Sequence, residues 1–135
     1  MTVTRACGSC LCGSVAFTAD WPSKWVAHCH CTRCQRAHGA AFVTWVGMDA
    51  ACVRLFDPAG ALRWYLAESG ASRGFCANCG SPMLFKSPAC PGELHIARAL
   101  FTDPVDREPE SNGFIGERVA WANHIERLPN DPEPP

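Results

Sequence analysis

The sequence lacks an apolar run long enough to cross a membrane. Its longest mostly apolar stretch, residues 39–48, is far shorter than the roughly 20 residues that a membrane-spanning helix needs. Residues 1–5 also lack the apolar core of a signal peptide. We therefore expect a cytoplasmic protein that makes no membrane contact.

An excess of basic charge is also missing. The chain has 12 Lys and Arg residues against 13 Asp and Glu residues, which gives a formal net charge of -1. Nucleic-acid-binding surfaces are built from clustered basic side chains, and the sequence has no basic arm. We expect no nucleic-acid partner, and no pattern in the sequence points to a particular oligomeric state.

Helical periodicity is weak throughout, and no internal repeat is present, so we expect a mainly β fold. The segments that alternate, or that are rich in β-branched and aromatic residues, predict strands. These segments are 14–19, 41–46, 52–56, 62–66, 93–97 and 118–124, the last centred on Trp121; residues 24–28 are expected to be extended, and residues 72–75 and 82–85 lead into and out of the Cys76-x2-Cys79 motif. We expect a single domain over residues 1–128 and a disordered tail over 129–135, where four prolines occur.

Only short helical turns are expected, and the clearest of them covers residues 32–38. Thr32 is the predicted N-cap, and Gly39 is the predicted stop. Residues 7–13, which precede the first expected strand, read as a Gly-rich turn that carries thiols.

Cysteine, by contrast, is abundant, and its spacing favours metal ligation over disulfides. Ten cysteines occur, several of them as near neighbours in C-x-C pairs such as Cys10 with Cys12 and Cys29 with Cys31. Such neighbours cannot pair with each other without strain. They suit a metal ion that needs several sulfur ligands at one point.

Cys29, Cys31 and Cys34 form a cluster with no fourth cysteine close behind it. An extended C-x-C segment places both side chains on one face, and a turn would bring the third thiol back over them. Zinc binds sulfur at about 2.3 Å, which separates tetrahedral sulfurs by about 3.8 Å. The trio therefore predicts a zinc site with an open position. The alternative is a closed structural site whose fourth ligand is His28, His30, His38, Cys52 or Cys90.

A second predicted site combines two half-sites that are far apart in the sequence. Cys76-x2-Cys79-Gly80 is typical of a zinc knuckle, and Cys10-x-Cys12-Gly13 supplies two further thiols. Four thiolates would close the coordination shell, so this site should be structural. Two alternatives remain: Cys7 with Cys10 as the first half-site, and buried or redox-active cysteine pairs.

The open site favours sulfur chemistry. Zinc with three thiolates has a formal charge of -1, and it is a softer and weaker Lewis acid than zinc with neutral ligands. We expect a thiol at the open position and reaction at a carbon–sulfur bond. His30 or His38 could transfer the proton, and Arg33 and Arg36 could hold a carboxylate. The alternative is that these are ordinary solvated residues.

The remaining conspicuous residues have structural explanations. Trp21, Trp25, Trp45, Trp64 and Trp121 are expected mainly in the core. His95 alternates with apolar neighbours and should face solvent. Cys52 is expected to be a small buried apolar residue, and Cys90 to be a free loop thiol or a pocket-lining one.

Taken together, these motifs resemble one known family. Cys10-x-Cys12-Gly13-x-Val15-x-Phe17, Cys29-His30-Cys31-x2-Cys34 with Gly39 and Phe42, and Phe75-Cys76-x2-Cys79-Gly80 are similar to the GFA family. This family contains the glutathione-dependent formaldehyde-activating enzymes and centromere protein V. The resemblance covers residues 10–121. Some relatives have a His ahead of the strand at Trp121, where this chain has Asn112 and Gly113.

The resemblance implies a fold, two metal sites and an activity. The fold would be a β-tent of stacked antiparallel sheets around a structural zinc at Cys10, Cys12, Cys76 and Cys79. A labile catalytic zinc would lie at Cys29, Cys31 and Cys34. The implied activity is that of a carbon–sulfur lyase, exemplified by joining formaldehyde and glutathione as S-hydroxymethylglutathione. The partner would be a small-molecule thiol such as glutathione.

Two non-enzymatic functions are compatible with the same cysteines. A zinc module could bind a protein or chromatin partner, as centromere protein V suggests, although the net charge of -1 disfavours nucleic acid. Alternatively, the trio could act as a zinc–thiolate redox sensor that releases its metal on oxidation.

Overall fold

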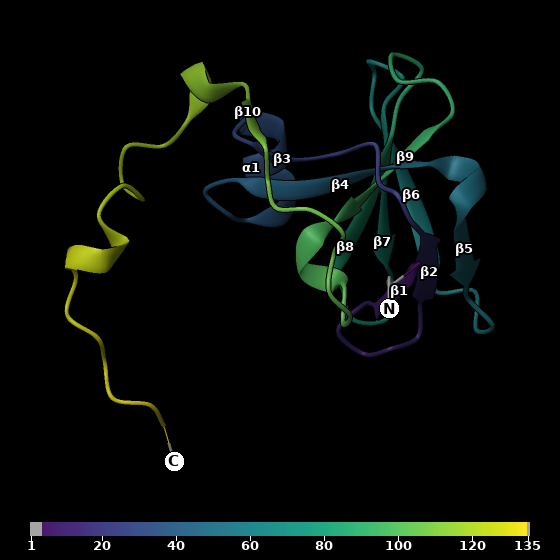
Figure 1. Cartoon of the computed structure of the whole chain (residues 1–135), viewed down its shortest axis with the longest axis horizontal. Coiled ribbons are helices and arrows are strands. Elements are labelled where there is room, and N and C mark those ends of the chain that lie inside the picture. Colours follow the sequence, from purple (N-terminus) through teal and green to yellow (C-terminus); the bar gives the residue numbers. More distant parts are fainter. Residues whose placement is uncertain (1–3, 135) are drawn as a thin grey trace.

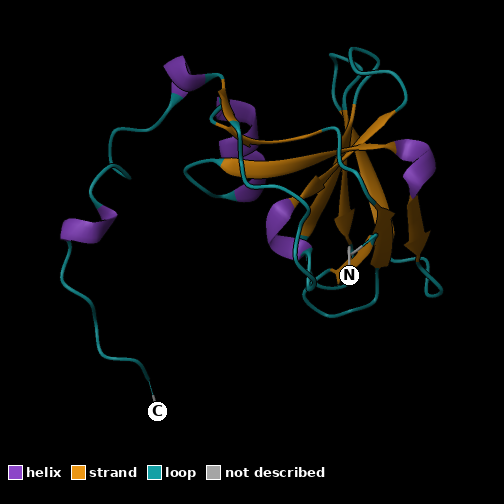
Figure 2. Cartoon of the chain, in the orientation of Figure 1, coloured by secondary structure: helices purple, strands orange, loops and turns teal. Residues whose placement is uncertain are grey.

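Two β-sheets and one short α-helix make up residues 4–134, the part of the chain that the computed structural model describes (Figures 1 and 2). This arrangement confirms the mainly β expectation. The strands are β1 (Arg5–Ser9), β2 (Ala16–Asp20), β3 (Trp25–Cys29), β4 (Val43–Asp49), β5 (Val53–Phe56), β6 (Leu62–Leu66), β7 (Ser72–Cys76), β8 (Pro82–Lys86), β9 (Glu93–Ala97) and β10 (Ser111–Gly113). Helix α1 spans Thr32–His38, and 3-10 turns lie at Ala50–Cys52, Arg98–Leu100, Ile115–Glu117 and Ile125–Arg127.

The smaller sheet has the strand order β1-β2-β5, and the larger has the order β10-β3-β4-β9-β8-β7-β6. All strand pairs are antiparallel except β10 with β3, which run parallel. The stacked antiparallel arrangement is therefore confirmed, with one parallel edge strand added. This edge lies next to α1 (Figure 1).

The main core lies between the two sheets. Most of its large, fully buried side chains come from β2 in the smaller sheet and from β3, β4, β8 and β9 in the larger. Phe17, Val26, Met48, Met83 and Ile96 are each at most 1 % exposed. Burial of a side chain of this size contributes about 1.5–3 kcal/mol each, so this core is the main source of stability.

Strand β4 is buried on both faces, and it therefore contributes to two cores. Val46 and Met48 belong to the core between the sheets, whereas Val43 and Trp45 pack with Cys31 and Cys34 in a second cluster. This second cluster places the cysteine trio on the far side of the large sheet from β1 and β2.

The N-cap of helix α1 lies one residue before the predicted one. Cys31 is the N-cap, and its Sγ accepts a hydrogen bond from the Cys34 amide at 3.3 Å. Thr32 was wrongly expected in this role; instead it is the first helical residue. Gly39 ends the helix as predicted, with φ 59°, in the left-handed region that favours glycine.

Two other expectations were wrong. The predicted turn over residues 7–13 begins inside β1, which pairs with β2 from Arg5 to Ser9. Residues 118–124 form no strand, and Trp121 is 76 % exposed instead of lying in the core. After β10 the chain runs away from both sheets (Figure 1).

Expectations about the chain ends stay predictions. The expectation that residues 1–5 form no signal peptide rests partly on residues 1–3, and the predicted disordered tail includes Pro135. These residues lie outside the described range. Within residues 4–134, no helix combines the length and apolar character needed to span a membrane.

Gly47 in β4 gives a direct test of the packing around Trp25. A Cβ at Gly47 would overlap the Trp25 ring, which lies flat against this backbone. We expect Gly47→Ala to lower the free energy of unfolding by about 1–3 kcal/mol, as overpacking usually does. Gly116→Ala is the control, because a Cβ there meets no atom within 4 Å. Urea unfolding of both variants measures the effect, and equal stability would contradict this packing.

Candidate metal centres

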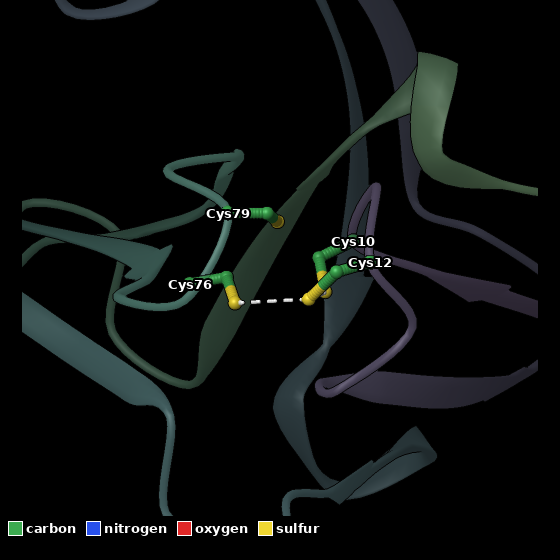
Figure 3. A group of neighbouring side chains, drawn as sticks. All are labelled: Cys10, Cys12, Cys76 and Cys79. Carbon is green, nitrogen blue, oxygen red and sulfur yellow. Dashed lines mark hydrogen bonds between the residues drawn. The ribbon is translucent and has the colours of Figure 1, made fainter.

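Four thiols from two distant parts of the chain point toward one another (Figure 3). Cys10 and Cys12 follow β1, Cys76 ends β7, and Cys79 lies in the turn after it. The sulfur of Cys12 lies 3.7 Å from that of Cys10 and 3.8 Å from that of Cys76. These separations match the roughly 3.8 Å between sulfurs around tetrahedral zinc, so the thiols fit this ion.

Tight turns direct these thiols inward. Gly13 and Gly80 have φ values of 81° and 79°, which a residue with a side chain rarely adopts. Their amides close the turns by donating to the carbonyl groups of Cys10 and Cys76. The two loops also contact each other, because the Leu11 amide donates to Ser81 Oγ at 2.9 Å.

Hydrogen bonds favour the thiolate form at two of the four thiols. At Cys76, by contrast, a backbone hydrogen bond with Cys79 is outweighed by burial and by the neighbouring thiols, which raise the pKa to about 11. A contact with Ser14, and then one with the side-chain amide of Asn78, lower the pKa of Cys12 to about 7. Ser81 lowers the pKa of Cys79 to about 5. Because metals bind the thiolate, these contacts prepare the cluster for a cation.

Cys7, the alternative ligand, is not among the clustered thiols. It is exposed and lies in β1, where only its backbone is engaged: its amide donates to Asp103 Oδ2 at 2.8 Å. The geometry therefore favours the four-thiol set of Cys10, Cys12, Cys76 and Cys79.

The predicted trio is also brought together. The sulfurs of Cys29, Cys31 and Cys34 lie within 4.8 Å of one another, where β3 leads into α1. Cys31 and Cys34 are buried, whereas Cys29 is half-buried. The pKa of Cys34 is lowered to about 4, first by a hydrogen bond with Cys29 and then by contacts that include Cys31 and Arg73.

No fourth ligand completes the trio within residues 4–134. His28 Nδ1 bonds Thr44 Oγ1 at 2.7 Å, and His30 Nε2 bonds Asn112 Oδ1 at 2.9 Å. His38 packs edge-on against Trp45, and burial lowers its pKa. Cys52 and Cys90, the other candidate ligands, also lie outside this cluster.

A cavity of about 330 Å³ lies near the trio, although none of the three cysteines lines it. Val43, which pairs with Cys29 across β3 and β4, forms part of its wall. The complete lining is His38, Ala40, Phe42, Val43, Thr44, Ala97, Arg98 and Ala99. Arg33 and Arg36, which the sequence offered either as carboxylate ligands or as solvated residues, are exposed on α1 and do not line it. Arg98 does, and sequence spacing gave no sign of it.

Arg73 is a second residue that the sequence interpretation missed. Its Nη1 and Nη2 atoms donate to Cys34 Sγ at 3.7 and 3.6 Å. The guanidinium also lies 5.1 Å from the centre of the Phe85 ring. Arg73 is 39 residues from Cys34, so local spacing could not reveal this contact.

Glu117 joins the segment after β10 to the start of α1. Its Oε1 accepts from the Thr32 amide at 3.0 Å and from Thr32 Oγ1 at 3.1 Å, and these bonds lower the pKa of Glu117. The Gln35 side chain donates to the carbonyl groups of both His30 and Glu117. These contacts fix the helix that carries Cys34.

A third group, Cys90, Glu93 and His95, brings possible ligands together, but its carboxylate is already satisfied. Glu93 accepts from Lys24 at 3.0 Å, His95 at 2.9 Å and Trp25 at 3.4 Å. Although burial opposes it, hydrogen bonds from His95 and Lys24 lower the pKa of Glu93. His95 is buried, so its expected solvent-facing position was wrong. We interpret this group as an ion-paired support for β9.

Replacing Cys79 tests the four-thiol site. Cys79→Ser should lower the zinc content by about one ion per chain and remove several kcal/mol of stability, because structural zinc contributes folding energy. Cys7→Ser is the matched control and should change neither quantity. Metal analysis and thermal unfolding measure both. Equal zinc content in the two variants would contradict the site.

The pair of Glu93 and His95 should make the fold sensitive to acid. Burial lowers the pKa of His95, so below the unfolded value of about 6.5 the unfolded chain binds the proton more readily and stability falls. The lowered pKa of Glu93 has the same sign: its contribution is present above about 4.3 and is lost below that value as the carboxylate is protonated.

His95→Gln should therefore flatten the loss of stability between pH 7 and pH 5, by at most about 1.4 kcal/mol per pH unit. Urea unfolding across this range gives the slope. His124→Gln changes an exposed histidine and should retain the wild-type slope. An unchanged slope in His95→Gln would refute this assignment.

Comparisons with known proteins bear on the fold and on the family. A crystal structure of a Rhodobacter sphaeroides protein, a structural genomics target, is similar with a TM-score of 0.64 and 21% sequence identity. The match covers 78% of this chain and 98% of that chain, and it shows the fold alone. No curated protein matches. The family profile described as glutathione-dependent formaldehyde-activating enzyme matches residues 5–117. Because this match spans most of the chain, the protein belongs to the GFA family.

Proposed function

We propose that the protein is a zinc-dependent carbon–sulfur lyase that acts on the adduct of a thiol and a small aldehyde, such as glutathione and formaldehyde. The observation that carries this proposal is the trio of Cys29, Cys31 and Cys34, which has no fourth donor beside it within residues 4–134 and packs against Val43 and Ala97 of the cavity wall. The choice of glutathione and formaldehyde as reactants is supported by the family description.

The two cysteine clusters have different roles in this proposal. Cys10, Cys12, Cys76 and Cys79 would hold a structural zinc with four thiolates, whereas Cys29, Cys31 and Cys34 would hold a zinc to which the protein supplies three ligands. When bound at the trio, zinc supplies a position that holds a thiol as its thiolate. All other contributions come from the side chains around the cavity.

Those side chains can position both reactants. Phe42, Val43 and Ala97 give the cavity an apolar wall that excludes water from the aldehyde. Arg98 is half-buried at the cavity and has no carboxylate within ion-pair distance among residues 4–134. It is therefore available for the carboxylate of a thiol such as glutathione.

His38 is the proposed proton carrier. It lines the cavity, and because burial lowers its pKa the imidazole is neutral and can accept a proton. In the forward direction the thiol loses its proton, a carbon–sulfur bond forms, and the carbonyl oxygen gains the proton. The reverse reaction breaks that bond, so no oxidant or reductant is needed. His30 is less suited, since its Nε2 is engaged by Asn112.

Cys31→Ser tests the proposal. Serine can still cap α1, so the fold should be retained. Turnover should fall more than about a hundredfold, because even the loss of a residue that only supports a metal ligand lowers activity about 10–100-fold. Cys52→Ser, outside both clusters, is the control. NMR measures the formation of S-hydroxymethylglutathione, and circular dichroism measures whether the variant is folded. Unchanged turnover in folded Cys31→Ser would remove the trio from the reaction.

A further inference from the structure

Arg73 carries a charge that no carboxylate balances. It is half-buried on β7, and none of the ion pairs within residues 4–134 includes it. A partly buried cation without a counter-charge is costly. The polar partner that the structure gives its guanidinium is the sulfur of Cys34, which two of its nitrogens contact.

The position of Arg73 is fixed by the sheet. Arg73 and Phe85 are paired residues of β7 and β8, and the guanidinium lies over the Phe85 ring. Phe85 also packs against Trp45, which belongs to the buried cluster around Cys31 and Cys34. The cation is therefore held against the trio by strands that contribute no cysteine to it.

The charge of the occupied trio explains what such a cation would do. A divalent ion with three thiolates has a formal charge of -1, and a fourth thiolate makes it -2, whereas a neutral fourth ligand leaves it at -1. Accumulated negative charge disfavours the fourth thiolate. A guanidinium at hydrogen-bond distance from one of the sulfurs offsets that repulsion.

We propose that Arg73 determines the ligand specificity of the trio by making its fourth position accept an anionic thiolate in preference to a neutral ligand. This inference rests on the proposed function, because it assumes a metal at the trio. Arg73 acts through Cys34 as a positioning residue. A lysine would keep the charge, but it would lose the planar, two-pronged contact and the stacking on Phe85.

Cobalt(II)-loaded protein provides a test that does not depend on turnover. Wild type, Arg73→Met, Arg73→Lys and Arg54→Met are loaded with cobalt, and metal content is measured first. Each is then titrated with 2-mercaptoethanol, whose only charge is the thiolate, and separately with imidazole, a neutral ligand. The change in the cobalt absorption bands reports binding at the trio, because the four-thiol site has no free position. Cys31→Ser provides the baseline.

The proposal makes a selective prediction. Thiolate binding should weaken by about 10–100-fold in Arg73→Met, the range for a lost hydrogen bond to a charged group, while imidazole binding stays at the wild-type level. Arg73→Lys should fall between the two. Arg54→Met removes the same charge from an exposed position on β5 and should match the wild type.

The possible failures are distinguishable. If Arg73→Met weakens thiolate and imidazole equally, or weakens neither, the specificity role is overturned while the proposed function stands. If wild type itself shows no thiol-dependent change, both the proposed function and this inference fail. If only Arg73→Met fails to load the second metal ion, Arg73→Lys is compared with the wild type instead. A thiolate affinity in Arg73→Lys equal to that of the wild type would overturn the proposed need for the two-pronged contact.

Discussion

The convergence of four thiols from two different sheets is the constraint on which the rest of the structure depends. Cys10 and Cys12 follow a strand of the smaller sheet, and Cys76 ends a strand of the larger one. Joining these points through one ion would fix the distance between the sheets at one end of the core. The packing of Phe17 and Met83 between the sheets then becomes a consequence of both burial and ligation.

The second cysteine cluster lies on the opposite face of the large sheet, where its surroundings differ. Strand β4 separates the two, because its alternate side chains face either the main core or the trio. The first cluster links elements that must stay together, whereas the trio packs against Val43 and Ala97, which line a cavity. The four-thiol cluster and the trio therefore lie on opposite sides of β4.

Local spacing was sufficient to predict the features that involve near neighbours. The trio, the two half-sites of the four-thiol cluster, the helix that ends at Gly39 and the strands around Leu62–Leu66 and Glu93–Ala97 all follow from patterns within a few residues. Trp121 shows the limit of that approach, because its segment has a strand-like composition but no neighbouring strand to pair with. Strand propensity depends on such a partner.

The residues around the trio were harder to predict, since they come from distant strands. Arg73, Arg98 and Glu117 reach the site or its helix through the sheet topology. His95 was misplaced for a related reason. Its alternation with Leu94 and Ile96 predicted a strand with one buried face and one solvent-exposed face. Strand β9 instead lies inside the sheet, and both of its faces are buried.

The uneven burial of the trio has a consequence for chemical damage. Cys31 and Cys34 are only 5% and 3% exposed, whereas Cys29 remains partly open. A peroxide or an alkylating agent arriving from solvent therefore meets Cys29 first. Attack at that single sulfur would remove one candidate ligand while leaving the helix cap at Cys31 intact, so the proposed metal site would be lost without loss of the fold.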